Sequence, residues 1–447
     1  MYVRGSAYKI YLLVILVAVF AFSLVDTLAL ALIQENVKSD LDLSDTQLGV
    51  LTGAGYWVIY AAMGVPIARW ADRGDRVTII AISVGVWSLG VVSTAMAGTF
   101  PQLVLMRILA AVGAAGCMAP ANSLISDVFT REERPQAFSR YMFAIPLVCV
   151  IGYFVAGWLN ERYGWRTTLA TLGLPGIALA ALVKLTVSEP RKERLTELQP
   201  RPVPCDHADA SGLHDVWRPL WVNGTFRYLL LGNVVYQFVT NGIQAWQAVF
   251  FIRKFGLKSG EVGIWLAVIG GVFGLLGTWL GGEWATRSAP GERRQLQAVA
   301  LGFASYGALL MCAFLLPNYH LAFLLMGLAS VGLMMVMGVM YAGIQAAAPV
   351  RTRATAVAAV ALFSYLIGAL GPSLVGVLSD ALHYRAGPEP LRYVLVSLCP
   401  GYLWSAWFFW RAARTVPRDL KHGHVDQDAL PKDDAALPFT AGTARPP

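Results

Sequence analysis

Residues 64–76 read Gly64-Val-Pro-Ile-Ala-Arg-Trp-Ala-Asp72-Arg73-Gly74-Asp75-Arg76 and separate two long apolar runs. The preceding run covers residues 46–69 and the following run covers residues 77–97. Each run is long enough to cross about 30 Å of hydrocarbon as a helix. The segment between them is short and concentrates charged residues and glycine. We therefore expect a tight loop between two membrane-spanning helices.

The composition of the whole chain indicates lipid as its solvent. Of the 447 residues, 56% are hydrophobic and only 14% are charged, whereas a soluble domain carries about a quarter charged residues. A net charge of +8 can also indicate a nucleic-acid partner. The basic residues lie in the loops between apolar runs, so we expect membrane lipids as neighbours and no nucleic-acid partner. The five cysteines are scattered without metal-ligand spacing, so no metal or cofactor is expected.

Apolar runs of about 20 residues recur along the chain and predict an all-α membrane protein with twelve transmembrane helices. Ser44 and Gln47 form a capping-box pattern ahead of the second run. The first run is too long for a signal peptide, and it contains Asp26. The predicted spans cover residues 9–33, 46–69, 77–97, 101–126, 137–159, 166–187, 225–252, 260–285, 295–316, 319–348, 354–382 and 391–411.

The distribution of Lys and Arg predicts the orientation of these spans. With the N-terminus inside, the inner loops and tails hold 26 of the 35 Lys and Arg residues. The outer loops hold 8, and Arg107 lies within a span. Cytoplasmic loops are enriched in basic residues. We therefore expect a multi-pass protein of the plasma (inner) membrane with both termini in the cytoplasm.

The chain divides into two related halves. Residues 45–73 and 259–287 align at a constant offset of 214, with Gly49 on Gly263, Trp70 on Trp284, Ala71 on Ala285 and Arg73 on Arg287. A parallel repeat of this kind is typical of six-plus-six transporters. The predicted units are a six-helix half at 1–187, a cytoplasmic linker at 188–220, a second six-helix half at 221–414 and a disordered cytoplasmic tail at 415–447.

The loop at 64–76, glycine followed by an Asp-Arg-x-Gly-x-Arg turn, resembles the signature inner loop of the major facilitator superfamily. Other segments narrow the resemblance to the Spinster family. These segments are Leu43-Ser-Asp-Thr-Gln-Leu-Gly49, Arg107 followed by Gly113 and Gly116, Asn122-Ser-Leu-Ile-Ser-Asp127, Ile145-Pro146-Leu147, Gly164-Trp165-Arg166, Leu185-Thr-Val-Ser-Glu-Pro190, and Gly371-Pro372 with Gly376 and Asp380.

The resemblance implies a fold, a mechanism and a solute class. It implies two pseudo-symmetric six-helix halves, alternating access, and an amphipathic solute such as a lysophospholipid or a sphingoid phosphate. Glu35 matches a family glutamate, but two positions depart from the family pattern. Thr27 follows Asp26 where an arginine is typical, and Ala114 stands where a glutamate is typical. The usual residues at both positions take part in binding or proton coupling, so the coupling ion stays open.

Asp26 and Arg107 are the first candidates for a transport site. A charge in the bilayer interior costs at least a few kcal/mol, so such residues indicate function. Each lies about 10 Å from the outer end of its span, at 1.5 Å per residue, and the two spans line one cavity in this superfamily. We expect the two charges to meet and to form a solute or proton site, with a purely structural ion pair as the alternative.

Span 7 provides the second group of candidates. Its polar residues recur at helical spacing and share one face, which predicts the wall of a water-filled cavity. Hydrogen bonding between helices is the alternative role for such amides. The face comprises Asn233, Gln237, Thr240, Asn241, Gln244 and Gln247.

The inner loop provides candidates for gating, namely Gly64, Asp72, Arg73, Arg76 and Asp127. In the family arrangement, Asp72 lies against the N-terminus of span 11, near Arg353. The N-terminus of a helix carries about half a positive charge. Arg73 is then expected to pair with Asp127. These contacts are expected to form only when the inner side is closed.

No motif indicates an enzyme: GxSxG, HExxH and the P-loop lysine motif are absent from the sequence. The prediction is a secondary transporter that acts as a monomer on a small-molecule or lipid-like solute, with proton coupling left open. A broad-specificity drug or metabolite exporter is the first alternative. A non-transporting membrane sensor or scaffold is the second.

Overall fold

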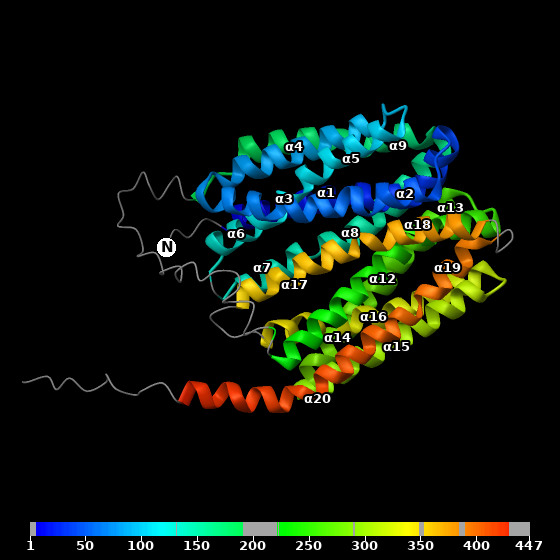
Figure 1. Cartoon of the computed structure of the whole chain (residues 1–447). Coiled ribbons are helices and arrows are strands. Elements are labelled where there is room, and N and C mark those ends of the chain that lie inside the picture. The colour runs from blue at the N-terminus through cyan, green and yellow to red at the C-terminus, as the bar shows by residue number, and fades with distance from the viewer. Residues whose placement is uncertain are drawn as a thin grey trace, which may run out of the picture.

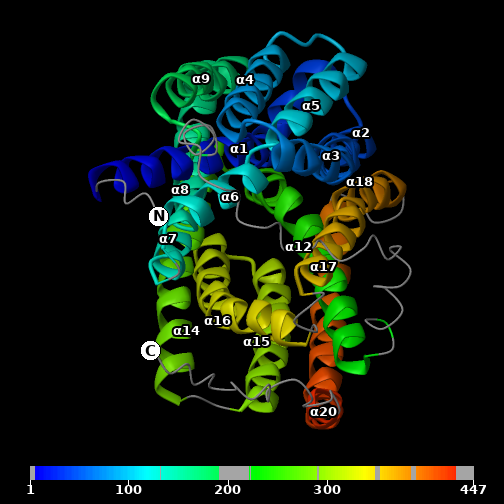
Figure 2. The same cartoon turned by 90° about the vertical axis from the view of Figure 1, so that its left-hand side faces the viewer.

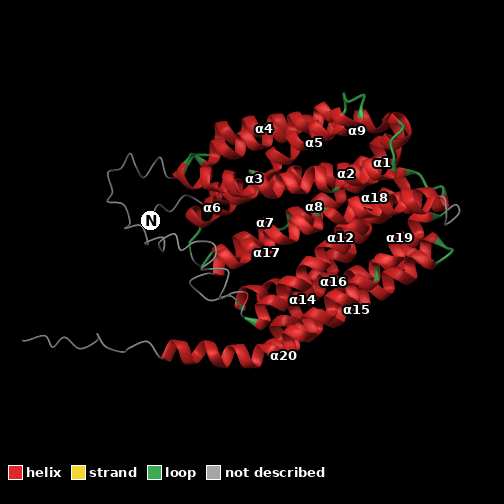
Figure 3. Cartoon of the chain, viewed as in Figure 1, coloured by secondary structure: helices red, strands yellow, loops and turns green. Residues whose placement is uncertain are grey.

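The computed structural model describes residues 6–130, 132–190, 221, 223–288, 291–347, 353–383 and 389–428. Across these residues the chain is helical and forms no strand (Figure 3). Nine helical segments of the described ranges are long and apolar enough to cross a membrane. The predicted all-α membrane fold is therefore confirmed.

The helices before the linker follow the predicted apolar runs. The predicted second and fourth spans are each built from two helices in sequence. A turn at Gly164, whose φ of 79° suits glycine, separates the predicted fifth and sixth spans. The elements are α1 (Ser6–Leu41), α2 (Asp45–Thr52), α3 (Ala54–Arg73), α4 (Arg76–Thr94), α5 (Phe100–Ala115), α6 (Met118–Val128), α7 (Arg134–Tyr141), α8 (Ala144–Cys149), η1 (Val150–Val155) and α9 (Ala156–Thr186).

After the linker, the predicted eighth span is built from three segments, and the eleventh and twelfth spans are each built from two. The elements after the linker are α12 (Gly224–Phe255), α13 (Ser259–Val268), η2 (Ile269–Phe273), α14 (Gly274–Ser288), α15 (Glu292–Leu315), α16 (Tyr319–Ala346), α17 (Arg353–Gly368), α18 (Leu370–His383), α19 (Pro390–Leu398) and α20 (Pro400–Asp428).

The predicted tail begins at residue 415, and α20 extends to Asp428. A formed helix gains a hydrogen bond with each added residue, so it extends past the apolar segment that nucleated it. Residues 191–220 of the predicted linker and residues 429–447 of the predicted tail lie outside the described residues.

The helices pack as two groups, α1–α9 and α12–α20. In the first group α4 packs on α5 and α9, and in the second α15 packs on α16 and α20. Figures 1 and 2 show the first group in the upper part of the molecule and the second group in the lower part. The two groups contact each other where α2 packs on α18 and where α13 packs on α9 and η1.

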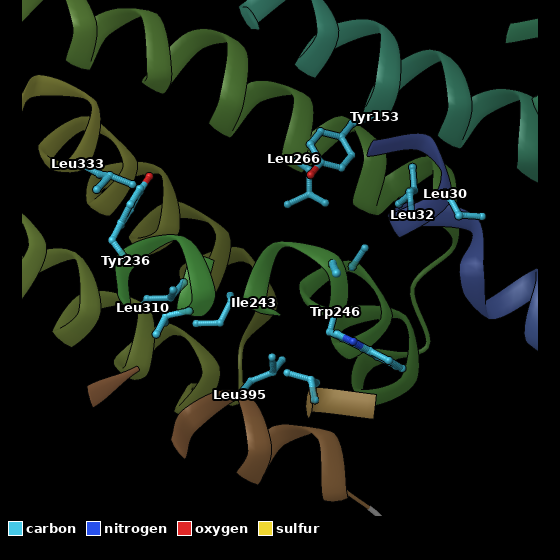
Figure 4. Packing of buried hydrophobic residues seen from close by; sticks show 14 of the residues in the cluster. Leu30, Leu32, Tyr153, Tyr236, Ile243, Trp246, Leu266, Leu310, Leu333 and Leu395 are labelled. Atoms are coloured by element: carbon cyan, nitrogen blue, oxygen red, sulfur yellow. The ribbon is translucent and has the colours of Figure 1, made fainter. Parts of the chain in front are cut away.

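Buried apolar side chains join the two groups. Figure 4 shows Tyr153 of the first group beside Leu266 of α13. Trp246 of α12 is fully buried, and its indole nitrogen donates a hydrogen bond to the Pro372 carbonyl at 3.0 Å. A buried indole N–H needs such a partner, so this bond helps to fix α12 against α18.

Glycines bring α2 and α18 into backbone contact. We call the end of the bundle where Leu41 and Asp45 lie the outer end, following the predicted orientation, and the opposite end the inner end. At the outer end, a Cβ added to Gly49 would lie 2.6 Å from the Pro372 carbonyl oxygen. A Cβ added to Gly53 would lie 2.6 Å from the Ala369 carbonyl oxygen. Small residues allow membrane helices to approach this closely.

The same arrangement recurs between α13 and the first group. A Cβ on Gly157 of α9 would lie 2.7 Å from the Ser259 carbonyl oxygen, and Gly263 packs on the backbone of Tyr153. Towards the inner end, by contrast, nothing lies within 4 Å of a Cβ added to Gly64 of α3 or Gly282 of α14. The tight contacts between the two groups at these glycines therefore lie at the outer end.

Candidate functional site

A buried ion pair joins α1 to α5. The Arg107 guanidinium pairs with the Asp26 carboxylate through Nη1 and Oδ2. The relative exposures of Asp26 and Arg107 are 0% and 2%. The indole nitrogen of Trp87 on α4 donates a second hydrogen bond to Asp26 Oδ1 at 3.0 Å. The structure thus brings together the two charges that we expected to meet.

Arg107 keeps hydrogen-bonding capacity beyond this pair. Its Nε and Nη2 atoms are buried and make no hydrogen bond within the described part of the chain. The guanidinium carbon lies 4.4 Å from the centre of the Tyr56 ring, a cation–π contact. A guanidinium offers five N–H donors in a planar fork that suits carboxylates and phosphates. Arg107 can therefore hold an anionic group while it remains near Asp26.

The two positions that depart from the family pattern lie in the same helices and add no charge. Thr27 follows Asp26 on α1, and its hydroxyl oxygen is buried. Ala114 on α5 is 1% exposed. The Asp26–Arg107 pair is consequently neutral as a unit.

Four aromatic side chains connect this pair to α17. Tyr56 packs edge-on against Trp57 with ring centroids 5.2 Å apart. Trp57 and Tyr365 stack with centroids 5.7 Å apart and an interplanar angle of 2°. Tyr60 also packs against Tyr365, at 5.7 Å. We call Tyr56, Trp57, Tyr60 and Tyr365 the aromatic bridge, because it spans from the first helix group to the second.

A cavity lies beside the aromatic bridge, between α12, α16 and α17. It holds about 90 Å³ of space open to water-sized molecules. Its lining residues include amides and hydroxyls and, among the residues described, no charged side chain. They are Asn233, Gln237, Tyr341, Ile344, Gln345, Val360, Ala361, Ser364 and Tyr365.

The predicted polar face of α12 divides among several neighbours. Asn233 and Gln237 line the cavity, as expected of a cavity wall. Thr240 instead shares a hydrogen bond of 3.0 Å with Tyr402 of α20. Asn241 lies against Gly368 of α17, and Gln244 lies beside the Tyr153 hydroxyl. The face is therefore too wide for one cavity, because it also supplies contacts between helices.

Glu35 lies away from the buried pair, at the outer end. Nine residues beyond Asp26 on α1 correspond to about 13 Å along the helix. There Arg253 of α12 contacts Glu35 Oε2 at 2.9 Å and both oxygens of Asp45 at 2.8 Å. Lys38 also contacts Asp45, at 2.5 Å. We call Glu35, Lys38, Asp45 and Arg253 the outer ion cluster, and it joins the two helix groups.

Asp380 of α18 strengthens the same junction. Its carboxylate accepts hydrogen bonds from the Thr46 backbone nitrogen at 2.7 Å and from the Thr46 hydroxyl at 2.6 Å. A carboxylate at a helix N-terminus is favourable because the first N–H groups of the helix have no partner within it. Ser379 also donates to Asp45 at 2.6 Å. Asp380 and the segment that begins α2 both stood out in the sequence as part of the family resemblance, but the contact between them was not predicted.

The inner-end pairing differs from the predicted one. Asp127 pairs with Arg76 at 2.6 Å, and the described residues contain no Arg73–Asp127 pair. Arg76 is fully buried and also contacts Glu189 at 2.5 Å. The physical reason is that α4 begins at Arg76, which directs its side chain into the bundle. Asp72 and Arg73, before the turn at Gly74, are exposed.

A second inner ion pair involves the first helix. The Lys9 ammonium donates to Glu133 at 2.6 Å. This hydrogen bond lowers the pKa of the Glu133 carboxyl from its usual value. It ties the start of α1 to the segment before α7.

Known proteins resemble this chain along most of its length. A family model described as Major Facilitator Superfamily matches residues 14–423. An MFS-type efflux pump of Mycolicibacterium smegmatis is 29% identical over 91% of this chain and 93% of its own length. Protein spinster homolog 1 of Xenopus tropicalis is 25% identical over 96% of this chain and 86% of its own length.

A solved structure shares the fold and the sequence. It is a bacterial homolog of the human lysosomal transporter Spinster, in an inward-facing and unoccupied conformation. It has a TM-score of 0.80 and 27% sequence identity, and it covers 93% of this chain and 99% of its own.

Proposed function

Because the chain belongs to the Major Facilitator Superfamily and is a Spinster-like secondary transporter, we propose that it moves an amphipathic, lipid-like solute by alternating access. Two six-helix halves, at 1–187 and 221–414, rock about the site between them. The protein lies in the plasma membrane, with the linker and both termini in the cytoplasm. This assignment rests on the positive-inside pattern of the loops.

The buried Asp26–Arg107 pair is the main observation that supports the proposed class of solute. The unpaired nitrogens of Arg107 can hold an anionic head group such as a phosphate. The aromatic bridge next to it offers a flat apolar surface for the less polar part of the solute. An amphiphile with an anionic end suits both features.

The same pair gives a route for proton coupling. Protonation of Asp26 removes its negative charge and weakens its hold on Arg107. Arg107 is then free to bind the anionic solute, whereas a deprotonated Asp26 competes with it. Proton and solute are thereby linked through one guanidinium.

A broad-specificity exporter is the second candidate. The similarity to an MFS-type efflux pump over 91% of the chain favours it. Stacked aromatic side chains accept many flat or apolar molecules without fixed hydrogen bonds. The two candidates differ in whether an anionic group on the solute is required.

The inner gate is part of the proposal. Asp72 approaches the N-terminus of α17 when the inner end closes, and Gly64 allows α3 to approach it. Arg76 and Asp127 hold the base of the loop in place, with Arg73 beside them.

The deciding experiment is uptake of a lysophospholipid into proteoliposomes, with and without a pH gradient. Asp26→Asn should abolish the pH dependence of uptake because the proposed proton-carrying carboxyl is lost, while the protein still inserts and runs as a monodisperse species. Asp40→Asn serves as the matched control, since Asp40 forms an exposed ion pair with Arg166 at the outer end.

Two results contradict the proposal in different ways. Wild-type pH dependence in Asp26→Asn shows that the pair is structural. Equal uptake of neutral and anionic solutes by the wild type favours the broad-specificity exporter.

A further inference from the structure

We propose that the inner end of α12 and α20 carries a surface site for the head group of an anionic phospholipid of the cytoplasmic leaflet. The inference goes beyond the proposed function, because this lipid binds on the outside of the bundle and is not the transported solute. It uses the same orientation of the chain, with the inner end at the cytoplasmic surface. We call the site the basic–aromatic patch, and its residues are Arg227, Tyr228, Trp407, Phe408, Arg411 and Arg414.

The three arginines of the patch lie at one level of the bundle. α12 and α20 pack side by side (Figure 2), and the Thr225 and Thr415 hydroxyls share a hydrogen bond of 2.8 Å. At a rise of 1.5 Å per residue, Arg227 lies about 3 Å from this bond along α12. Arg411 and Arg414 lie about 6 Å and about 1.5 Å from it along α20. The two helices thus bring basic residues from distant parts of the sequence to the same end of the bundle.

Ring contacts join the basic residues of the two helices. The Arg227 guanidinium carbon lies 5.5 Å from the centre of the Tyr228 ring. The Tyr228 and Phe408 ring centroids are 6.5 Å apart, and Phe408 packs edge-on against Trp407 at 5.0 Å. The Arg411 guanidinium carbon lies 5.1 Å from the centre of the Trp407 ring. Because this row of contacts is continuous from α12 to α20, the arginines border one surface.

The arginines of the patch have no acidic partner. Within the described residues, none of Arg227, Arg411 and Arg414 forms an ion pair, and Arg411 and Arg414 are exposed. Other basic side chains of the inner end do have such partners, as Arg76 and Arg287 show. An unpaired guanidinium keeps its N–H donors for a ligand, and its planar fork suits a phosphate. The patch therefore offers several guanidinium groups to an anionic phosphate.

The apolar side of the patch indicates that this phosphate belongs to a lipid. The exposed residues Leu403, Trp407 and Arg411 recur at four-residue spacing and share one face of α20. Towards the inner end, that face changes from apolar to basic. Trp407 is 47% exposed, and Trp404 is 59% exposed. A phospholipid of the cytoplasmic leaflet has the same order, with its acyl chains towards the bilayer centre and its phosphate at the surface, whereas a soluble anion would use the arginines alone.

Competition between two phospholipids that differ in charge tests this inference. The probes are a phosphatidylglycerol and a phosphatidylcholine with the same acyl chains, added in equal amounts to the purified full-length protein. Native mass spectrometry counts the lipids that the protein retains. The wild type should retain phosphatidylglycerol in preference, because only its head group carries a net negative charge.

Variants of α20 locate the bound lipid. Arg411→Gln/Arg414→Gln should lower the affinity for phosphatidylglycerol about 25-fold, since each basic residue near an anionic surface contributes about fivefold. The affinity for phosphatidylcholine should not change. Arg411→Lys/Arg414→Lys should keep most of the preference because the charges remain, which separates lost charge from a damaged fold. Arg287→Gln is the matched control, since Arg287 is also exposed at the inner end but pairs with Glu283.

Four results overturn the proposal. Equal retention of the two lipids by the wild type shows that no anionic lipid site exists. A preference that persists in Arg411→Gln/Arg414→Gln places the lipid elsewhere on the protein, and an equal loss in Arg287→Gln makes the effect one of general charge. Displacement of phosphatidylglycerol by inorganic phosphate at the same concentration shows a site for a soluble anion. None of these measurements involves transport, so a failure of lysophospholipid uptake would contradict the proposed function and leave the patch standing.

Discussion

Arg76 shows how a single buried charge is made stable in this protein. Its guanidinium contacts Glu189 at 2.5 Å, Asp127 at 2.6 Å and the Ser123 hydroxyl at 2.8 Å. The Glu189 side chain is itself only 3% exposed. Arg76 and Glu189 therefore form an ion pair that is buried away from water.

Removal of Arg76 is expected to destabilise the protein strongly. Arg76→Ala removes the cation of the buried Arg76–Glu189 ion pair, and loss of one member of such a pair costs about 3–5 kcal/mol. The melting temperature in detergent, followed by intrinsic fluorescence, should fall by several degrees. Arg69→Ala, at an exposed position of the same loop region, should leave the melting temperature near that of the wild type. A melting temperature unchanged in Arg76→Ala would mean that Glu189 finds water or becomes protonated.

For individual residues, the sequence predicted contacts that depend on how deep a residue lies in the membrane. It did not predict contacts that depend on the direction of a side chain. Equal depth in two spans predicted that Asp26 and Arg107 could meet. Arg73 and Arg76 lie on either side of a glycine turn, and only the local backbone decides which of them points inward. Trp87, which binds Asp26, looks like any other packing residue in an apolar run.

Helix pairs at the outer end depend on glycine. Gly49 on α2 and Gly263 on α13 occupy equivalent places in the internal repeat, and each contacts the backbone of a helix in the opposite group. The repeat therefore preserves a packing role as well as a sequence. The two contacts close the outer end from two sides.

A methyl group at Gly49 is expected to open the outer end. In Gly49→Ala the new Cβ would lie 2.6 Å from the Pro372 carbonyl oxygen and 3.0 Å from the Ser373 Cα, and backbone atoms cannot rotate away. The distance between spin labels at Ser39 and Ala381 should lengthen or broaden. Gly282→Ala, where nothing lies within 4 Å, should leave that distribution unchanged. Matching distributions in both variants would show that α2 and α18 can shift without separating.

Hydropathy predicted the helical segments well, because the bilayer requires about 20 apolar residues in each span. It did not predict where a span breaks into two helices, as at Gly53 and between Leu398 and Pro400. Such breaks reflect contacts with neighbouring helices, which a hydropathy pattern does not contain. Hydropathy also did not predict the C-terminal part of α20, because the residues there are polar.

At the scale of the whole molecule, the outer ion cluster holds the two helix groups together at the outer end. Arg253 belongs to the second helix group, whereas Glu35 and Asp45 belong to the first. Opening the outer end must separate these charges. The cluster therefore favours the outer-closed state over the outward-open one.

Arg253→Gln should raise the outward-open population. The change retains a long polar side chain but removes the charge, and a partly exposed pair contributes about 1 kcal/mol, or about fivefold in the equilibrium. The label pair at Ser39 and Ala381 reports the shift. Arg392→Gln is the control, because Arg392 also lies at the outer end but pairs with Glu389 within its own group.

The proposed inner gate should act in the opposite direction. Asp72→Asn removes the anion that would face the start of α17, so it should lower the outward-open population, read from labels on the inner ends of α3 and α17. Shifts in the same direction for Arg253→Gln and Asp72→Asn would contradict the two-gate arrangement. The sequence predicted the fold, but hydropathy and motifs are identical in every conformational state, so they cannot indicate which end of the protein is closed.

The neutrality of the Asp26–Arg107 pair also has an electrical consequence. A single charge that crosses the full membrane potential gains or loses about 2.3 kcal/mol per 100 mV. The two buried charges contact each other and cancel, so they move as a dipole of small extent when the helix groups rock. The return of the unloaded carrier is then nearly insensitive to voltage at this site. Any current that accompanies turnover comes from the solute and the protons that travel with it.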